Sequence, residues 1–242
     1  MHYINITLFV DHISVGALGD SFYEYLLKSY IQSQDLQAKR MFEEAVKAIE
    51  SQLIQRSVSG LVYLAELKYD RLEHKMDHLA CFSGGLFALS AKHLNNSQHL
   101  ETARALTETC FQSYNRTATG LGPESFRFTR QMEAVASRMN EKYYILRPEV
   151  VESYFYLWRA THEQKYREMA WQVVLALNSY CRVEHGFSGL KNVYDTQSPK
   201  DDVQQSFLFA ELFKYLFLIF SEDDVIDLDS WVFNTEAHPL PY

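Results

Sequence analysis

The chain has 242 residues, of which 47% are apolar and 14% aromatic, and its formal net charge is −8. This length suits one large domain or two small ones, and the apolar content is enough for a sizeable core. The negative charge argues against nucleic acid or an anionic membrane surface as a partner, and it favours a hard cation or a neutral polar ligand. The aromatic side chains could stack on sugars, although most aromatics in a folded domain serve its core.

The sequence predicts neither a secretory signal nor a membrane span. Residues 1–5 have no basic start and no long apolar run. The most apolar stretch, residues 207–220, is short and contains Glu211 and Lys214. A targeting segment is therefore expected upstream of Met1, and N-x-Ser/Thr sequons are consistent with a secretory compartment. The sequons begin at Asn5, Asn95 and Asn115.

In chain order, hydrophobic periodicity and turn residues predict helices in hairpin pairs. The first helix opens near Asp20 with a capping box formed by Ser21 and Glu24. An extended segment is predicted over residues 60–69, and strand and coil follow Ser221. The predicted helices cover residues 20–34, 37–54, 78–93, 97–115, 148–162, 164–183 and 203–220. No linker interrupts residues 1–242, so we expect a single domain whose helix pairs close on themselves or expose an apolar flank.

The segment from Arg147 to Ser153 contains two acidic residues at the start of a predicted helix. Pro148 suits the first helical position, and Glu149 and Glu152 then lie on one face of the first turn. The helix dipole there favours the ionised carboxylates and lowers their pKa. The segment therefore predicts either a pair of charged carboxylates beside Arg147 or an ordinary well-capped helix.

Other acidic residues also lie at helix entrances, namely Asp20, Glu24 and Glu124. Glu211 lies within an apolar run, where a carboxylate must be paired or ligated, and Lys214 one turn on is the alternative partner. A short polar patch, residues 234–239, follows near the C-terminus. Carboxylates that converge from several helix ends can bind calcium through oxygen ligands or act as acid and base on a glycosidic bond.

Six ordered segments resemble the class I α-1,2-mannosidases, the inverting enzymes of glycoside hydrolase family forty-seven. The resemblance extends from about Ser14 to Tyr242, and residues 14–20 are most similar to the Golgi branch. It implies an all-α fold, a partial (α/α)7 barrel of helical hairpins with short β segments at the rim and C-terminus. The six segments are residues 20–28, 76–82, 120–124, 146–153, 201–207 and 232–239.

The resemblance implies calcium-dependent hydrolysis of terminal α-1,2-linked mannose from high-mannose N-glycans. Glu149 matches the general base that activates water, and Asp20 and Glu124 match further catalytic carboxylates. Thr235 matches the residue that binds Ca²⁺ through its side-chain and carbonyl oxygens, a hard-oxygen site. The residues that match the sugar pocket and the calcium-bound waters are Glu24, His78, Arg147, Glu152, Phe207, Glu211 and Glu236.

Cys81 and Cys110 match the family's disulfide pair, which would tie two successive helices together. The alternative is two buried reduced cysteines. A disulfide requires an oxidising compartment, so the resemblance implies the lumen of the Golgi or endoplasmic reticulum, with a membrane anchor upstream of this chain. Cys181 is expected to be a buried, small apolar residue.

The chain departs from the family in length. The first half of the family's barrel, with an upstream glutamate proposed as the principal acid, has no counterpart here. We therefore expect the C-terminal portion of a catalytic barrel, inactive or poorly soluble alone because its flanks are uncovered. Two alternatives stay open: a non-catalytic glycan-binding relative used in glycoprotein quality control, and a helical-hairpin interaction module without sugar chemistry.

Overall fold

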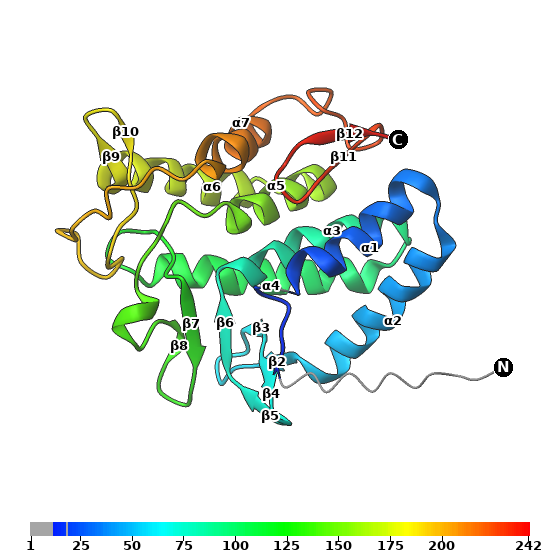
Figure 1. Cartoon of the computed structure of the whole chain (residues 1–242), viewed down its shortest axis with the longest axis horizontal. Helices are drawn as coiled ribbons and strands as arrows, with labels where there is room; N and C mark the ends of the chain where they lie inside the picture. The colour runs from blue at the N-terminus through cyan, green and yellow to red at the C-terminus, as the bar shows by residue number, and fades with distance from the viewer. Residues whose placement is uncertain (1–11, 18) are drawn as a thin grey trace.

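The structure, a computed structural model, describes residues 12–17 and 19–242. Its helices form antiparallel pairs stacked side by side (Figure 1). Helix α3 packs between α1 and α5, and α5 also packs against α7, so these four form one row. The helices are α1 (Asp20–Ser33), α2 (Leu36–Gln52), α3 (Ser83–His93), α4 (Ser97–Asn115), α5 (Glu149–Thr161), α6 (Lys165–Ala176) and α7 (Lys214–Phe220).

Short helical segments of other types join or extend these helices. A 3-10 turn, η1 (Leu79–Phe82), leads directly into α3, and another, η2 (Met139–Glu141), precedes α5. The wider π-helical segment η3 (Leu177–Cys181) extends α6, and η4 (Leu208–Phe213) leads into α7. Segments η1 and η4 directly precede α3 and α7. Their side chains therefore lie at the same end of the helical row as the start of α5.

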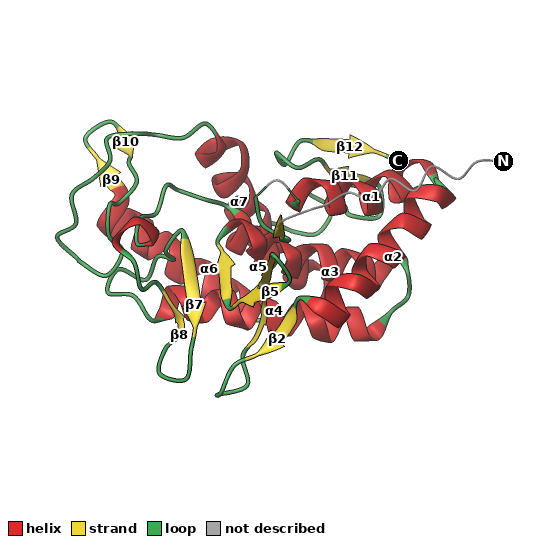
Figure 2. Cartoon of the chain, turned by 60° about the horizontal axis from the view of Figure 1, so that its bottom comes forward, coloured by secondary structure: helices red, strands yellow, loops and turns green. Residues whose placement is uncertain are grey.

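The strands are short and antiparallel, and Figure 2 shows β11 and β12 beside α1, away from β2, β5, β7 and β8. The pairing orders are β1-β4-β5, β2-β3, β6-β7-β8, β9-β10 and β11-β12. The strands are β1 (His12–Ile13), β2 (Ile54–Arg56), β3 (Val62–Leu64), β4 (Glu66–Lys68), β5 (Arg71–Glu73), β6 (Lys75–Asp77), β7 (Ser125–Phe128), β8 (Glu133–Val135), β9 (Arg182–Val183), β10 (Gly186–Phe187), β11 (Trp231–Phe233) and β12 (Pro239–Pro241).

Side-chain caps and left-handed residues set the hairpin turns. The carboxylate of Asp35 accepts from the amides that start α2, and the amide oxygen of Asn96 does the same for α4. Helix α1 is followed by Gln34 with a φ of 58°, and α5 is followed by His162 with a φ of 54°. These left-handed residues stop each helix and let the chain reverse within a few residues.

Helix α3 approaches α4 and α5 closely because glycines occupy its second and third positions. A Cβ on Gly84 would lie 2.1 Å from Oγ1 of Thr107 on α4 and 2.8 Å from Oγ of Ser153 on α5, and one on Gly85 would lie 2.7 Å from the ring of Tyr156 on α5. The hydroxyl of Ser153 on α5 accepts from the Gly85 amide at 2.8 Å and donates to the carbonyl of Cys81. This contact fixes η1 and the start of α5 relative to each other.

Most sequence predictions of the elements are confirmed. Helix α4 has the predicted bounds, and the extended segment over 60–69 contains β3 and β4. The predicted capping box is wrong, because α1 begins at Asp20 and Ser21 lies inside it. The helix predicted over 203–220 begins at 208, because Asp202 is left-handed and the side chain of Gln204 accepts from the Phe187 amide across the chain.

No helix of residues 12–17 and 19–242 is long and apolar enough to cross a bilayer. The sequon asparagines Asn95 and Asn115 are exposed, at the turn before α4 and at its end, whereas Asn5 lies outside the described residues. The side chains of both asparagines are therefore open to solvent.

Candidate active site

A pocket of about 60 Å³ lies where the starts of α1 and α5 meet η1, η4 and the turn between β11 and β12. It brings together Asp20, Glu149 and Thr235, which are far apart in the sequence. Apart from two apolar side chains, every lining residue carries an oxygen. The residues that line the pocket are Asp20, Glu24, Leu79, Phe82, Glu149, Glu152, Glu211 and Thr235.

Local hydrogen bonds present Thr235 at the tip of the C-terminal hairpin. The amide oxygen of Asn234 accepts from the Glu236 and His238 amides at 3.0 and 2.8 Å, which closes the turn. The Thr235 amide donates to the hydroxyl of Tyr25 on α1 at 3.3 Å. The turn is therefore held against the helix that carries Asp20.

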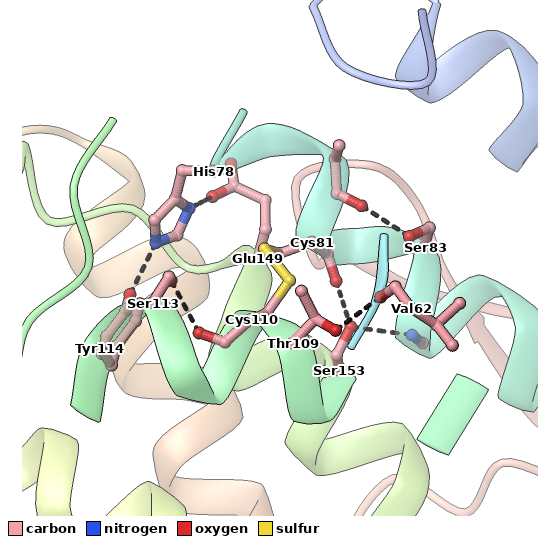
Figure 3. The surroundings of a disulfide bond; sticks show 12 residues. Val62, His78, Cys81, Ser83, Thr109, Cys110, Ser113, Tyr114, Glu149 and Ser153 are labelled. Carbon is pink, nitrogen blue, oxygen red and sulfur yellow. Dashed lines mark hydrogen bonds and ion pairs between the residues drawn. A yellow bond between two sulfur atoms is a disulfide. The ribbon is translucent and has the colours of Figure 1, made fainter. Parts of the chain in front are cut away.

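Glu149 is the first residue of α5, and two basic groups neighbour its carboxylate. Nδ1 of His78 lies 2.7 Å from Oε2, and Nη1 of Arg147 lies 3.9 Å from Oε1 (Figure 3 shows the His78 bond). Burial raises the pKa of Glu149, but the hydrogen bond and charge of His78 and the charge of Arg147 together lower it below its usual value. The lowered pKa agrees with the direction predicted for Glu149. The predicted first helical position of Pro148 is wrong by one residue, because α5 begins at Glu149 and Pro148 occupies the N-cap position.

Glu152 behaves differently from Glu149, although both lie in the first turn. Its carboxyl accepts from the hydroxyl of Tyr215 at 3.2 Å and faces Glu24. Burial, followed by the negative charge of Glu24, raises the pKa of Glu152 well above its usual value. The raised pKa of Glu152 is opposite to the predicted lowering, because its carboxyl faces Glu24 and lacks the His78 and Arg147 neighbours that lower the pKa of Glu149.

Two further carboxyls of the pocket have raised pKa values. Burial raises the pKa of Asp20, and the charges of Glu149 and Glu24 add to this effect. Burial and the charges of Glu149 and Glu236 raise the pKa of Glu211 to about 8. The alternative ion pair of Glu211 with Lys214 is absent, because the Lys214 ammonium donates to the carbonyl of Ala237.

A buried lysine lies beneath the pocket. Lys28 forms an ion pair with Glu24 one turn earlier on α1, and both side chains are only 5% exposed. Burial lowers the pKa of Lys28, but the neighbouring Tyr156, Glu24 and Glu152 raise it overall. The lysine is therefore charged and offsets part of the negative charge of the pocket.

Glu124 and Arg147 form a bidentate ion pair beside the pocket without lining it. The Arg147 Nε and Nη2 atoms donate to the two carboxylate oxygens of Glu124 at 2.6 and 2.7 Å. Burial lowers the pKa of Arg147, but the bond to Glu124 and the charge of Glu149 raise it overall. The β6–β7 pairing continues into this region, since the His78 amide donates to the Glu124 carbonyl at 2.8 Å.

Four residues predicted for the sugar pocket do not line it. Arg147 lies beside it in its pair with Glu124, and His78 is fully buried behind Glu149. Phe207 packs partly buried against the core before η4, and Glu236 is exposed beside Thr235. Sequence reasoning missed Leu79 and Phe82, although both lie in the matched segment 76–82. It also missed Lys28, whose spacing of four from Glu24 was the available signal, and Tyr114, for which the sequence offered no signal.

The disulfide between Cys81 and Cys110 is confirmed in the structure, with a Cα–Cα distance of 6.0 Å. It joins η1 to α4, next to the bonds of His78 in Figure 3. Cys181 is free and buried, as predicted, and burial raises the pKa of its thiol to about 12.

The pocket suits a hard cation by donor type, since carboxylate, hydroxyl and carbonyl oxygens are the ligands calcium prefers. Within residues 12–17 and 19–242, however, no three His, Cys, Asp or Glu side chains converge as direct metal ligands. The oxygens present fit a cation held by few protein atoms, with water completing its shell.

The structure thus shows stacked helical hairpins with a carboxylate-lined pocket at one end of the helical row. The profile of Glycosyl hydrolase family 47 matches residues 2–242, and the chain belongs to that family. It is 59% identical over 235 residues to mannosyl-oligosaccharide alpha-1,2-mannosidase IA of Drosophila melanogaster, covering 95% of this chain and 35% of that protein. It is 57% identical to the Sus scrofa protein of similar name, covering 95% of this chain and 36% of that protein.

The fold agrees with a solved member of the family. The alpha-1,2-mannosidase from Trichoderma reesei superposes with a TM-score of 0.87 at 30% identity, covering 94% of this chain and 52% of that one. The predicted all-α fold, part of an (α/α)7 barrel with short β segments, is therefore confirmed. The chain spans about half of that structure and about a third of the curated relatives.

Proposed function

We propose that the chain provides the calcium site and the water-activating carboxylate of an inverting α-1,2-mannosidase. The substrate class is terminal α-1,2-linked mannose on high-mannose N-glycans. One observation carries the proposal: Asp20, Glu149 and Thr235 line a single pocket, as the family resemblance requires. The names of the relatives, which describe mannosyl-oligosaccharide α-1,2-mannosidases, support the same substrate.

Glu149 is the general base in this proposal. Its lowered pKa keeps it ionised at neutral pH, so that its carboxylate can accept a proton from an attacking water. An inverting glycosidase places such a water between its base and the sugar, opposite the leaving group. The fixed position of Glu149 at the start of α5 orients this water.

Of the two remaining catalytic candidates in this chain, Asp20 fits the role of proton donor better than Glu124. The pKa of Asp20 is raised, so its carboxyl holds a proton more readily than an ordinary aspartate. Both oxygens of Glu124 are already occupied by Arg147. In this proposal Glu124 therefore serves to position Arg147 beside Glu149.

Thr235 would hold Ca²⁺ through its side-chain and carbonyl oxygens. Glu24, Glu152, Glu211 and Glu236 surround this position and would bind the waters of the calcium shell. The chemistry that the ion supplies when bound is the orientation of sugar hydroxyls and of the attacking water. In this proposal Phe207 contacts the sugar face from the entrance to η4, outside the pocket wall.

The proposed compartment is the lumen of the secretory pathway, in the Golgi or the endoplasmic reticulum, with membrane attachment provided by an upstream segment. Two observations support it: a disulfide, which persists in oxidising compartments, and exposed sequons at Asn95 and Asn115.

A chimera tests the proposal, since this chain spans 35% of the Drosophila relative. Residues 2–242 replace the matched segment of that protein, and mannose release from a high-mannose N-glycan is measured with calcium and with a chelator. We expect calcium-dependent release that Glu149→Gln abolishes and that Glu44→Gln, an exposed exchange on α2, leaves unchanged.

The same assay separates the alternatives. Binding of the glycan without mannose release would contradict the proposal and support a glycan-binding relative. Neither binding nor release in a folded chimera would support an interaction module. For the isolated chain, we expect no release in the same assay.

A further inference from the structure

A buried hydrogen-bond chain extends from Glu149 away from the pocket. His78 lies between Glu149 and Tyr114, with Nδ1 2.7 Å from the carboxylate and Nε2 2.6 Å from the Tyr114 hydroxyl (Figure 3). His78 is fully buried and Tyr114 is 2% exposed. The imidazole therefore has no contact with solvent, and both of its nitrogens depend on these two partners.

The hydroxyl of Tyr114 is suited to either state of the imidazole. A neutral imidazole has one donor and one acceptor nitrogen, and an imidazolium has two donors. A hydroxyl can accept from a protonated Nε2 or donate to a bare one, so Nε2 keeps a partner in both cases. A phenylalanine ring would fill the same space but would leave Nε2 buried without a partner, which costs free energy.

Several contacts fix the position of Tyr114 relative to His78. Tyr114 lies one turn after Cys110 on α4, and His78 directly precedes η1, which carries Cys81, so the disulfide joins their two elements. A Cβ on Gly122 would lie 2.2 Å from the Tyr114 ring, so the neighbouring backbone packs tightly against this ring. The hydroxyl is thus held in place by covalent and packing constraints independent of His78.

We propose that Tyr114 is a positioning residue for Glu149, because its hydroxyl holds the His78 ring with Nδ1 directed at the carboxylate that faces the pocket. The inference rests on the proposed function, in which Glu149 activates the attacking water. Tyr114 does not line the pocket and acts on Glu149 only through His78. It thereby adds a supporting residue that lies in α4, outside all the elements that line the pocket.

Other charged groups also face Glu149 and must stay constant in any test. Arg147 lies 3.9 Å away, and the carboxyls of Asp20 on α1, Glu152 on α5 and Glu211 on η4 act on the same region. Tyr114→Phe changes none of them. A difference between this variant and the wild-type chain therefore reports the hydroxyl alone.

The test is ¹⁵N-edited NMR of the histidine side chains in the 242-residue chain. We expect His78, assigned by comparison with His78→Gln, to show a slowly exchanging imidazole N–H in the wild-type protein. Tyr114→Phe should shift the Nε2 resonance of His78 and speed the exchange of the His78 Nδ1–H by about tenfold or more, because a buried hydrogen bond is lost. Tyr154→Phe, which removes a buried hydroxyl without a hydrogen-bond partner in the described chain, is the matched control and should leave both unchanged.

A folded Tyr114→Phe variant with wild-type His78 resonances would overturn the proposal. Rapid exchange of the His78 N–H in the unmutated protein would overturn it as well, and this second measurement needs no variant to fold. The spectra report the geometry of Glu149, His78 and Tyr114 whether or not a glycan is hydrolysed. A failed mannosidase assay and a failed positioning test are therefore separate results.

Discussion

Reduction of the Cys81–Cys110 disulfide should lower the stability of the chain by a predictable amount. The bond closes a loop with a sequence separation of 29 residues. In the chain-entropy treatment, a loop of this length restricts the unfolded state by about 12 cal/mol/K, or about 3.6 kcal/mol at 25 °C. Both cysteines are buried, so substitution by alanine would add the cost of cavities. Reduction of the unmutated chain avoids this second effect.

The assay is urea unfolding of the oxidised and the reduced chain, with the redox state checked by mass spectrometry. We expect the free energy of unfolding to fall by about 3–4 kcal/mol on reduction. Cys181→Ala, which removes the free cysteine, should preserve the difference between the two states. A difference below about 1 kcal/mol would show that the unfolded chain is not restricted by this loop, and the entropic reasoning would be refuted.

Three further predictions concern other parts of the chain. The pKa of Glu211 is raised to about 8, so the folded chain binds this proton more tightly than the unfolded chain, and stability should fall as pH rises from about 4.5 to about 8. Urea unfolding across that pH range should show a smaller fall in the free energy of unfolding for Glu211→Gln than for the wild-type chain. An equal fall in the two proteins would contradict the raised pKa of Glu211. Gly84→Ala should destabilise the chain by about 1–3 kcal/mol, because its Cβ would meet Thr107 on α4 and Ser153 on α5. An unchanged Tm would show that α3 can move away from α4 and α5 without cost. Secretion of the chain from eukaryotic cells should add glycans at Asn95 and Asn115. Deglycosylation should then lower the mass of the protein, and the Asn→Gln variants should lose this mass change. A secreted chain without glycans would count against the proposed compartment.

The sequence predicts best those elements whose signals are local. Helix α4 has the predicted bounds because Asn96 caps it and its buried residues recur with helical spacing. The helix predicted from residue 203 fails because the segment before η4 is held by non-local bonds. Gln204 and Asp201 bond residues of the 186–189 loop, which no local pattern reveals.

The same distinction holds for the site. The matched segments predict that Asp20, Glu149 and Thr235 belong together, and the structure places them in one pocket. The pKa of Glu152 could not be predicted, because it depends on burial and on Glu24 from another helix. The place of His78 behind Glu149 follows from the β6–β7 register, a tertiary feature that the sequence does not show.

The stereochemistry of hydrolysis tests the central claim most directly. The chimera is incubated with an α-1,2-linked mannose disaccharide and calcium, and the first product is followed by proton NMR before its anomers equilibrate. If Glu149 activates water at this pocket, β-mannose appears first, and Glu149→Gln gives no product. Appearance of α-mannose first, or undiminished release by Glu149→Gln, would contradict the account.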